Sequence, residues 1–249
     1  MRPLYRRQLP QLLVGLWLYG ATMALLVRAG LGLDPWDVFH QGLTRHLPLS
    51  FGEVTALVGV AVLLVWIPLR QKPGIGTILN IIVIAISVDA TLRLVPEPGP
   101  RDIEIRCALL VLGTLGNGLA GALYVGANLG SGPRDGLWLA IVRITGRSVR
   151  QARTALEVTV LTVGFLLGGT VNFGTVFYAL VIGHVVQFFL PRVRVLEAQE
   201  APGSAIAGVR PTEATPSAVP TPAIAVPEVA PSVARTGPAR LETERRVPA

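Results

Sequence analysis

Two short stretches of the sequence combine a glycine-rich turn with a proline and an aspartate, and they are its strongest candidates for chemistry. The first reads Ala29-Gly-Leu-Gly-Leu-Asp-Pro-Trp-Asp37 and the second reads Ala127-Asn-Leu-Gly-Ser-Gly-Pro-Arg-Asp135. Proline favours the first position of a helix, so Asp37 and Asp135 fall in the first helical turn, where a carboxylate can accept free backbone N–H groups. The sequence therefore predicts two helix caps. The compatible functional alternative is that two broken helices point their N-termini at a central site.

Polar side chains inside apolar segments are the second set of candidates. Asn80 and Asp89 lie in one such segment, and His184 and Gln187 lie in another. Burying an ionisable group in a membrane costs about 2.5–3.5 kcal/mol on insertion scales, so such residues are functional candidates by default. His184 lies nearer mid-segment and is a candidate proton-sensitive group, whereas Asp89 can also reach headgroup water. The full candidate set for a substrate pathway or gate is Asp37, Asn80, Asp89, Arg134, Asp135, His184 and Gln187.

The sequence offers no pattern for a metal site, a cofactor or a catalytic centre. Its single cysteine, Cys107, excludes an internal disulfide and a cysteine-based zinc site, and its three histidines have no carboxylate cluster beside them. We expect His40 and His46 to be wet interfacial side chains, and Glu157 to form an i,i+4 ion pair with Arg153. There is no nucleotide-binding loop and no Ser-His-Asp set, so we expect neither a cofactor nor an enzyme.

Composition points to the lipid bilayer as the solvent for these segments. Of 249 residues, 51% are hydrophobic and only 15% are charged, with a mean hydropathy of +0.56. A soluble domain carries about 25% charged residues, so this chain cannot cover a globule with water-compatible groups. The formal net charge is +7, but the arginines lie at the ends of apolar runs. This placement favours membrane orientation over nucleic-acid binding, and we expect no nucleic-acid partner.

The hydropathy pattern predicts an all-α membrane protein with six transmembrane helices, because a span needs about 20 mainly apolar residues. We expect the second and fifth segments, which are short, to extend into their polar flanks. Two shorter helices, interfacial or re-entrant, are predicted at Pro35–Leu47 and Pro133–Thr145. The predicted spans are Leu9–Val27, Val54–Leu69, Gly74–Leu94, Cys107–Ala127, Ala152–Gly168 and Phe173–Leu190.

The chain divides into a membrane domain over residues 1–196 and a tail over 197–249. The tail holds 9 of the 20 prolines, is rich in alanine and has no apolar period, so we expect it to be disordered. A passive cytoplasmic tail is the simpler interpretation, and recruitment of a protein partner through its prolines is the alternative. With both termini inside, twelve basic residues face the cytoplasm and five face the other side, as the positive-inside rule requires.

An internal repeat is the most specific signal in the sequence. Residues 15–98 align with 113–196 without a gap, and 24 of the 84 positions are identical. The matches include glycine, proline, aspartate and threonine, such as Gly32/Gly130 and Thr77/Thr175, which apolar composition alone does not align. Each copy contains three predicted spans, an odd number. The sequence therefore predicts two halves inserted in opposite orientations, a plan that many secondary transporters share.

These motifs resemble the YczE/YyaS/YitT family of bacterial integral membrane proteins. The resemblance rests on Gly-Leu-Gly-Leu-Asp-Pro-Trp-Asp, its partner Gly-Ser-Gly-Pro-Arg-Asp and the Gly-Ile-Gly-Thr start of the third span, and covers roughly residues 10–195. We expect no soluble C-terminal domain of the kind that YitT-type members carry, which makes the YczE-type branch the closer resemblance. The resemblance implies an integral membrane protein and does not identify a substrate.

The leading functional prediction is a small secondary transporter or permease of the bacterial inner membrane, with a small-molecule substrate. It rests on the analogy between inverted repeats and transporters. The competing prediction is a non-transporting accessory or scaffold protein that assists a synthase, exporter or envelope system. A transporter needs a polar cavity lined by both halves, whereas an accessory protein is expected to be a dry bundle with one exposed apolar groove.

Overall fold

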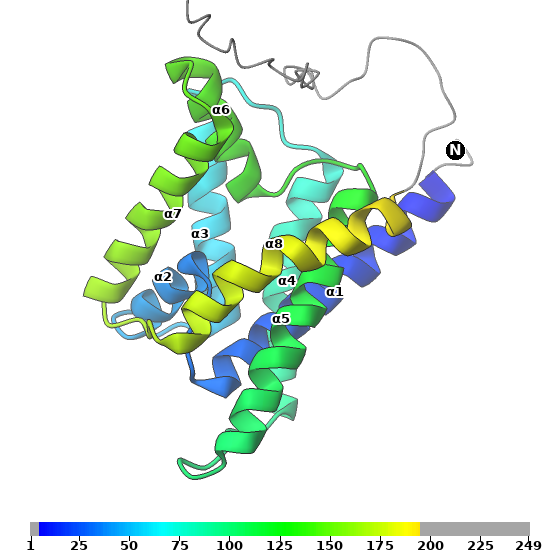
Figure 1. Cartoon of the computed structure of the whole chain (residues 1–249). Helices are drawn as coiled ribbons and strands as arrows, with labels where there is room; N and C mark the ends of the chain where they lie inside the picture. Colours follow the sequence, from blue (N-terminus) through cyan, green and yellow to red (C-terminus); the bar gives the residue numbers. More distant parts are fainter. Residues whose placement is uncertain (1–4, 195–249) are drawn as a thin grey trace, which may run out of the picture. The chain divides into compact units, whose positions relative to one another are not determined.

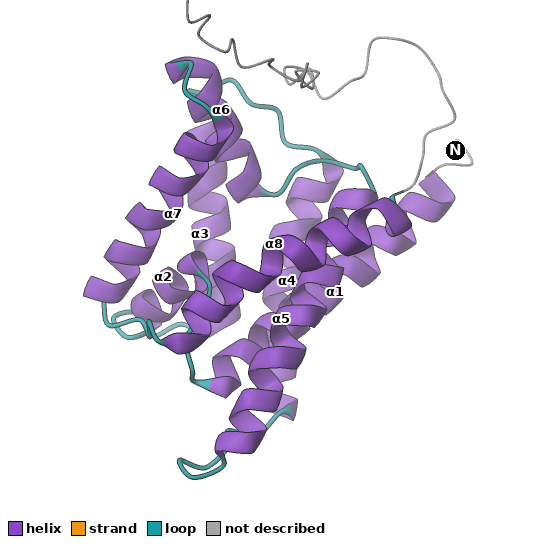
Figure 2. Ribbon diagram, viewed as in Figure 1, coloured by secondary structure: helices purple, strands orange, loops and turns teal. Residues whose placement is uncertain are grey.

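The computed structural model describes residues 5–194, and this part of the chain is built from helices without a strand (Figure 1, Figure 2). The predicted tail over 197–249 lies outside the described residues. The helices are α1 (Tyr5–Ala29), α2 (Pro35–Thr44), α3 (Phe51–Trp66), α4 (Ile75–Leu94), α5 (Ile103–Gly126), α6 (Pro133–Thr145), α7 (Val149–Leu166) and α8 (Phe173–Val193).

Four of the helices, α1, α4, α5 and α8, are long and apolar enough to cross a membrane. Their outward faces carry large exposed apolar side chains such as Ile82, Leu112 and Leu180, which marks the molecule as a membrane protein. The predicted count of six spans is not confirmed. Helix α3 has only 16 residues, and α7 carries Arg150, Arg153 and Glu157 within its 18 residues.

Helices α3 and α7 begin earlier than their apolar runs because each has a serine cap. The Ser50 hydroxyl accepts the backbone N–H of Glu53, and the Glu53 carboxylate accepts the N–H of Ser50. Ser148 and Gln151 form the same reciprocal pair at the start of α7. Such capping boxes fix a helix start in sequence. Both helices therefore extend into the expected polar flank at their N-terminal ends, but they end at Trp66 and Leu166, before the predicted ends at Leu69 and Gly168.

Helices α1 and α5 pack antiparallel along small residues. A Cβ on Gly15 would lie 2.8 Å from the backbone nitrogen of Tyr124, and a Cβ on Gly113 would lie 2.8 Å from Cδ2 of Leu26. The middle of each helix therefore touches the C-terminal part of the other. Gly15 and Gly113 are matched positions of the repeat, as are Leu26 and Tyr124. Close approach at small residues is the packing expected between helices in lipid.

The loops after α1 and α5 dock on the helix starts of the opposite repeat. The N–H of Gly174, at the start of α8, donates to the carbonyl of Leu31 at 2.7 Å. The N–H of Gly76, at the start of α4, donates to the carbonyl of Leu129 at 2.9 Å. These donors and acceptors are matched positions. Gly32 and Gly130, with φ of +117° and +128°, make the left-handed turns that bring the loops there.

The short helices also pack on the opposite repeat, α2 on α7 and α6 on α3. The two contacts differ in closeness. A Cβ on Gly164 of α7 would lie 2.5 Å from the backbone Cα of Phe39 in α2, so these helices meet backbone to backbone. In the α6–α3 contact, the position matched to Gly164 is Trp66 of α3. Its ring covers Gly136 of α6, and its Nε1 donates to the Pro133 carbonyl at 3.1 Å.

Candidate functional site

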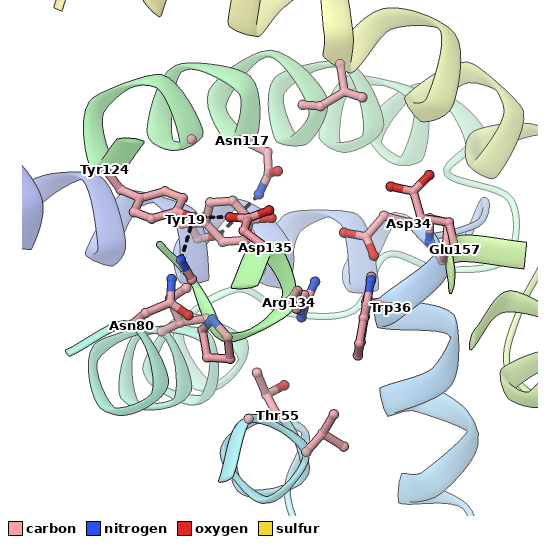
Figure 3. A pocket seen from close by; sticks show the side chains of 18 of the residues that line it. Tyr19, Asp34, Trp36, Thr55, Asn80, Asn117, Tyr124, Arg134, Asp135 and Glu157 are labelled. Atoms are coloured by element: carbon pink, nitrogen blue, oxygen red, sulfur yellow. Dashed lines mark hydrogen bonds between the residues drawn. The ribbon is translucent and has the colours of Figure 1, made fainter. Parts of the chain in front are cut away.

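A partly enclosed cavity of about 240 Å³, with polar and charged side chains in its wall, lies where the short helices meet the long ones. Helices from both repeats line it. Figure 3 shows Arg134 in the middle of the site, with Asp135 on one side and Asp34 and Trp36 on the other. Its polar and aromatic lining residues are Tyr19, Asp34, Trp36, His40, Thr55, Asn80, Asn117, Tyr124, Arg134, Asp135, Trp138, Arg153, Glu157 and Tyr178.

Most of this lining consists of residues related by the internal repeat. Matched positions stand 98 residues apart in the sequence, and both members of each pair reach the same cavity. The pairs with a polar or aromatic member are Tyr19 with Asn117, Asp34 with Gly132, Trp36 with Arg134, His40 with Trp138, Thr55 with Arg153, Gly59 with Glu157, and Asn80 with Tyr178. The cavity therefore sits where the two repeats face each other. The side chains at matched positions are chemically different.

Asp34, not Asp37, caps α2. The Asp34 carboxylate accepts the backbone N–H of Asp37 at 2.9 Å, and Asp34 is only 5% exposed. The prediction that Asp37 is a cap is wrong because the extended N-cap residue stands one position before Pro35. Asp37 is instead free to turn inward, where its side chain is completely buried.

The buried Asp37 carboxylate faces two groups from different elements. Its Oδ1 lies 3.6 Å from Nη2 of Arg134 on α6 and 3.3 Å from Nδ1 of His40 on its own helix. The Arg134 guanidinium also lies over the Trp36 ring, 5.1 Å from its centre. His40 is 1% exposed, so the expectation that it is a wet interfacial side chain is wrong. Helix α2 is packed inside the bundle, and its first turn and His40 border the cavity.

Asp135 does not cap α6 through its side chain either. The N-cap position is Gly132, which has no side chain to cap with. The Asp135 carboxylate accepts the hydroxyl of Tyr124 at 2.5 Å and the indole N–H of Trp138 at 3.4 Å. The same Tyr124 hydroxyl accepts the N–H of Gly132 at 3.2 Å. Tyr124 therefore joins the start of α6 to α5, and Asp135 is partly buried at the cavity wall.

A second polar chain crosses the cavity wall between α1, α5 and α8. The Tyr178 hydroxyl donates to Oδ1 of Asn117 at 2.7 Å, and Nδ2 of Asn117 donates to the Thr22 hydroxyl at 3.1 Å. Asn117 is 1% exposed, so these bonds satisfy a polar group that is costly to bury alone. They also fix the positions of two lining residues.

The ion pair predicted between Arg153 and Glu157 is confirmed at 2.8 Å. Both residues line the cavity, on its α7 side. Their side chains are 60% and 37% exposed, so the pair contributes little to stability. Its consequence for the site is that the Glu157 charge is neutralised by Arg153.

A model of a family of unknown function, DUF6198, matches residues 6–191. The chain belongs to the DUF6198 family. It is 42% identical to an uncharacterised protein of Haemophilus influenzae over 72% of this chain and 81% of that relative. It is also similar to two Bacillus subtilis proteins, the uncharacterised membrane protein YczE (31% identity, 70% of this chain, 80% of the relative) and the uncharacterised protein YyaS (24%, 72%, 90%). These matches confirm the YczE/YyaS resemblance. No solved structure matches.

Not all candidate residues of this DUF6198 protein come together. Asn80, Arg134 and Asp135 line the cavity, and Asp37 contacts Arg134 from behind. Asp89 lies away from it and holds the start of α3, accepting the Ser50 hydroxyl at 2.5 Å and the Gly52 N–H at 2.8 Å.

His184 and Gln187 are exposed on α8, where the structure places them outside the cavity lining. The His184 ring has its Nδ1 2.9 Å from the Leu180 carbonyl of the preceding turn. Within the described residues, no group of three or more His, Cys, Asp or Glu side chains is arranged for a metal ion.

The residues missed by sequence reasoning are Asp34 and the tyrosines Tyr19, Tyr124 and Tyr178. A usable signal was present for Asp34, since it directly precedes the proline at the first helical position. For two of the tyrosines, the internal repeat was a signal, because each is matched with a polar residue of the other copy. Tyr19 is matched with Asn117, and Tyr178 with the candidate Asn80, so a polar group stands at the same place in both copies.

Proposed function

We propose that this DUF6198 protein is a small secondary transporter. The observation that carries the proposal is the polar cavity formed by matched residues of both repeats. In transporters built from repeats, the substrate site lies at the interface between the copies, next to short or broken helices. Here the cavity is flanked by the N-terminal ends of α2 and α6.

The proposal includes an inverted repeat. Helices α1–α4 and α5–α8 form two copies, and a two-fold axis in the membrane plane relates them. The antiparallel packing of α1 on α5 supports this arrangement. The reciprocal contacts of Leu31 with Gly174 and of Leu129 with Gly76 support it as well. In this arrangement α3 and α7 complete six membrane-crossing segments, while α2 and α6 enter the membrane without crossing it.

The proposed location is the bacterial inner membrane, with both termini in the cytoplasm. The loop between α6 and α7 and the start of α7 carry Arg147, Arg150 and Arg153. The matched segment of the first repeat has Leu49, Gly52 and Thr55 at these positions. The positive-inside rule then assigns the α6–α7 end of the bundle to the cytoplasm.

An accessory role is the second candidate, and one observation favours it. An apolar groove between α1 and α4 is lined by Leu13, Val14, Trp17, Leu18, Val83 and Ile86. A helix of a partner membrane protein would fit such a groove, but lipid chains would fill it as well. The polar cavity argues for transport, because an accessory protein has no need for buried carboxylates inside the bundle.

The proposal is tested without knowledge of the substrate by measuring access to the cavity. Cys107 is the only cysteine and is exposed, so Cys107→Ser gives a cysteine-free background. Gly121→Cys then places one thiol in the cavity wall, where a Cβ meets only Val186 at 3.9 Å and Tyr19 at 4.0 Å. A transporter that alternates access exposes this thiol to a membrane-impermeant methanethiosulfonate from each side, in intact cells and in inverted vesicles.

The matched control is Gly183→Cys on α8, where nothing lies within 4 Å of a Cβ and the surface faces lipid. This thiol should resist the impermeant reagent from both sides. A cavity thiol that reacts from only one side, or from neither, contradicts alternating access and favours the accessory role.

A further inference from the structure

We infer that the cavity binds a small protonated amine. That the amine is transported rests on the proposed function, whereas its binding depends only on the cavity itself. Three properties of the wall lead to it: its charge, its hydrogen-bonding groups and its aromatic rings.

The first property is an excess of negative charge. The carboxylates in and behind the wall belong to Asp34, Asp37, Asp135 and Glu157, and the guanidinium groups belong to Arg134 and Arg153. Glu157 is paired with Arg153 and Asp37 with Arg134. In the part of the chain that the structure describes, no basic side chain lies within ion-pair distance of Asp34 or Asp135. Two ionised carboxylates in a partly enclosed site attract a cation, and their interaction is stronger than it would be in water.

The second property is a surplus of hydrogen-bond acceptors. Nδ1 of His40 lies beside the Asp37 carboxylate, which accepts and does not donate when ionised, so the proton of the ring belongs on Nδ1. Nε2 is then an acceptor, and it has no partner although it is buried. Asp34 is only 5% exposed, and the one hydrogen bond that its carboxylate accepts within the described residues is from the Asp37 N–H. Nε2 has almost no surface accessible from the cavity, so the acceptor open to a ligand is the Asp34 carboxylate, which calls for a ligand that brings N–H donors.

The third property is the aromatic lining. Trp36, Trp138, Tyr19, Tyr124 and Tyr178 all border the cavity. Ring faces attract cations and also cover the apolar part of an organic ligand. The protein's own Arg134 uses the Trp36 face in this way, at 5.1 Å. An amine with a short carbon chain therefore suits this wall better than an inorganic cation does.

The charge pattern also argues against an anion. Arg134 and Arg153 are the cations that an anion would need, and each already has a carboxylate partner. The cavity of about 240 Å³ is smaller than the roughly 300–1,000 Å³ usual for small-molecule pockets, so the ligand is small. A monoamine with a chain of about four carbons is a suitable probe.

The test is ligand binding to the full chain, purified in lipid nanodiscs, followed by tryptophan fluorescence and thermal stability. The probes are n-butylammonium, tetramethylammonium and butyrate, all at equal ionic strength. We expect saturable binding of n-butylammonium, weaker binding of tetramethylammonium because it has no N–H donor, and no binding of butyrate. Butyrate binding as tightly as n-butylammonium overturns the inference.

Two variants then assign the binding to the cavity. Asp34→Asn retains a good helix cap while removing the charge, so α2 should still form. Asp135→Asn removes the other unpaired charge. Each should weaken n-butylammonium binding about ten-fold or more, since a hydrogen bond to a charged group contributes at least that factor. The control is Glu104→Gln, an exposed carboxylate at the start of α5, which should leave binding unchanged. Unchanged binding in both aspartate variants also overturns the inference. If neither variant folds, the inference is judged by which of the three probes the parent protein binds.

Uptake into proteoliposomes separates this inference from the proposed function. Binding of n-butylammonium without its uptake supports the amine site and counts against transport. Uptake of a neutral or anionic solute, with no amine binding, supports transport and overturns the amine site.

Discussion

Nη2 of Arg134 on α6 lies 3.6 Å from Oδ1 of Asp37 on α2, and this ion pair joins the two short helices across the repeat interface. Asp37 is completely buried and Arg134 is 26% exposed. Arg134 stands at the position matched to Trp36, and its guanidinium lies over the ring of that very residue. The two copies therefore meet at a matched pair in which one residue has an aromatic side chain and the other carries a cation.

The first prediction concerns this ion pair. Arg134→Gln should destabilise the membrane domain by about 3 kcal/mol, because it leaves the completely buried Asp37 charge without its partner. Asp37→Asn should cost less, because the charge that it leaves on Arg134 is 26% exposed. The double variant should lose less than the sum, since it leaves neither charge behind. Thermal unfolding of the three variants in the same detergent gives the coupling. Additive losses would mean that the 3.6 Å contact contributes nothing of its own.

The second prediction compares two glycines in the contacts of the short helices. Gly164→Ala should cost about 1–3 kcal/mol or more, because the new Cβ meets the backbone of Phe39 at 2.5 Å and backbone cannot move aside cheaply. Gly136→Ala collides with the Trp66 ring, and a smaller residue at position 66 should relieve it.

Denaturation midpoints of Gly164→Ala, Gly136→Ala and the double variant Gly136→Ala/Trp66→Leu test this. The double variant should be more stable than Gly136→Ala, because the smaller side chain at position 66 makes room for the new Cβ. Gly183→Ala is the control, with an open site and a gain of about 0.5–1 kcal/mol from lower backbone entropy in the unfolded chain. If Gly164→Ala is as stable as this control, the close α2–α7 contact is wrong.

The third prediction assigns Asp89 to structure. Asp89→Ala removes the acceptor for the Ser50 hydroxyl and the Gly52 N–H at the start of α3. It should lower stability by about 1–2 kcal/mol. Ligand binding and access to the cavity should not change, because Asp89 lies outside the lining. A variant of normal stability that has lost binding would return Asp89 to the functional site.

The elements of the fold follow closely from sequence patterns. The apolar runs and the Pro-x-Asp helix starts predict all eight described helices. The Ser50 and Ser148 caps, which set the starts of α3 and α7, are local signals that this prediction did not use. Pro133–Thr145 is predicted at its observed bounds. The membrane-crossing role of α3 and α7 does not follow, since it depends on how deep each helix sits in the bilayer.

The site was harder to predict because orientation is a tertiary property. His184 and Gln187 have the same polar character as Asn80, yet they face outward on α8 while Asn80 faces the cavity. Asp37 and Asp34 are three residues apart, and only the position of the extended N-cap residue decides which one caps α2. Matching the polar residues of one repeat against those of the other would have brought Tyr19 and Tyr178 to notice.

The most direct test of the account is the side of the membrane on which Leu49 and Arg147 lie. They are matched positions of the repeat, both are exposed, and they stand in the α2–α3 and α6–α7 loops, which Figure 1 shows at opposite ends of the bundle. Leu49→Cys and Arg147→Cys in the Cys107→Ser background give one thiol each. An impermeant maleimide added to intact cells should label Leu49→Cys and not Arg147→Cys, and inverted vesicles should give the reverse. Labelling of both thiols from the same side would contradict the inverted repeat and the shared cavity that depends on it.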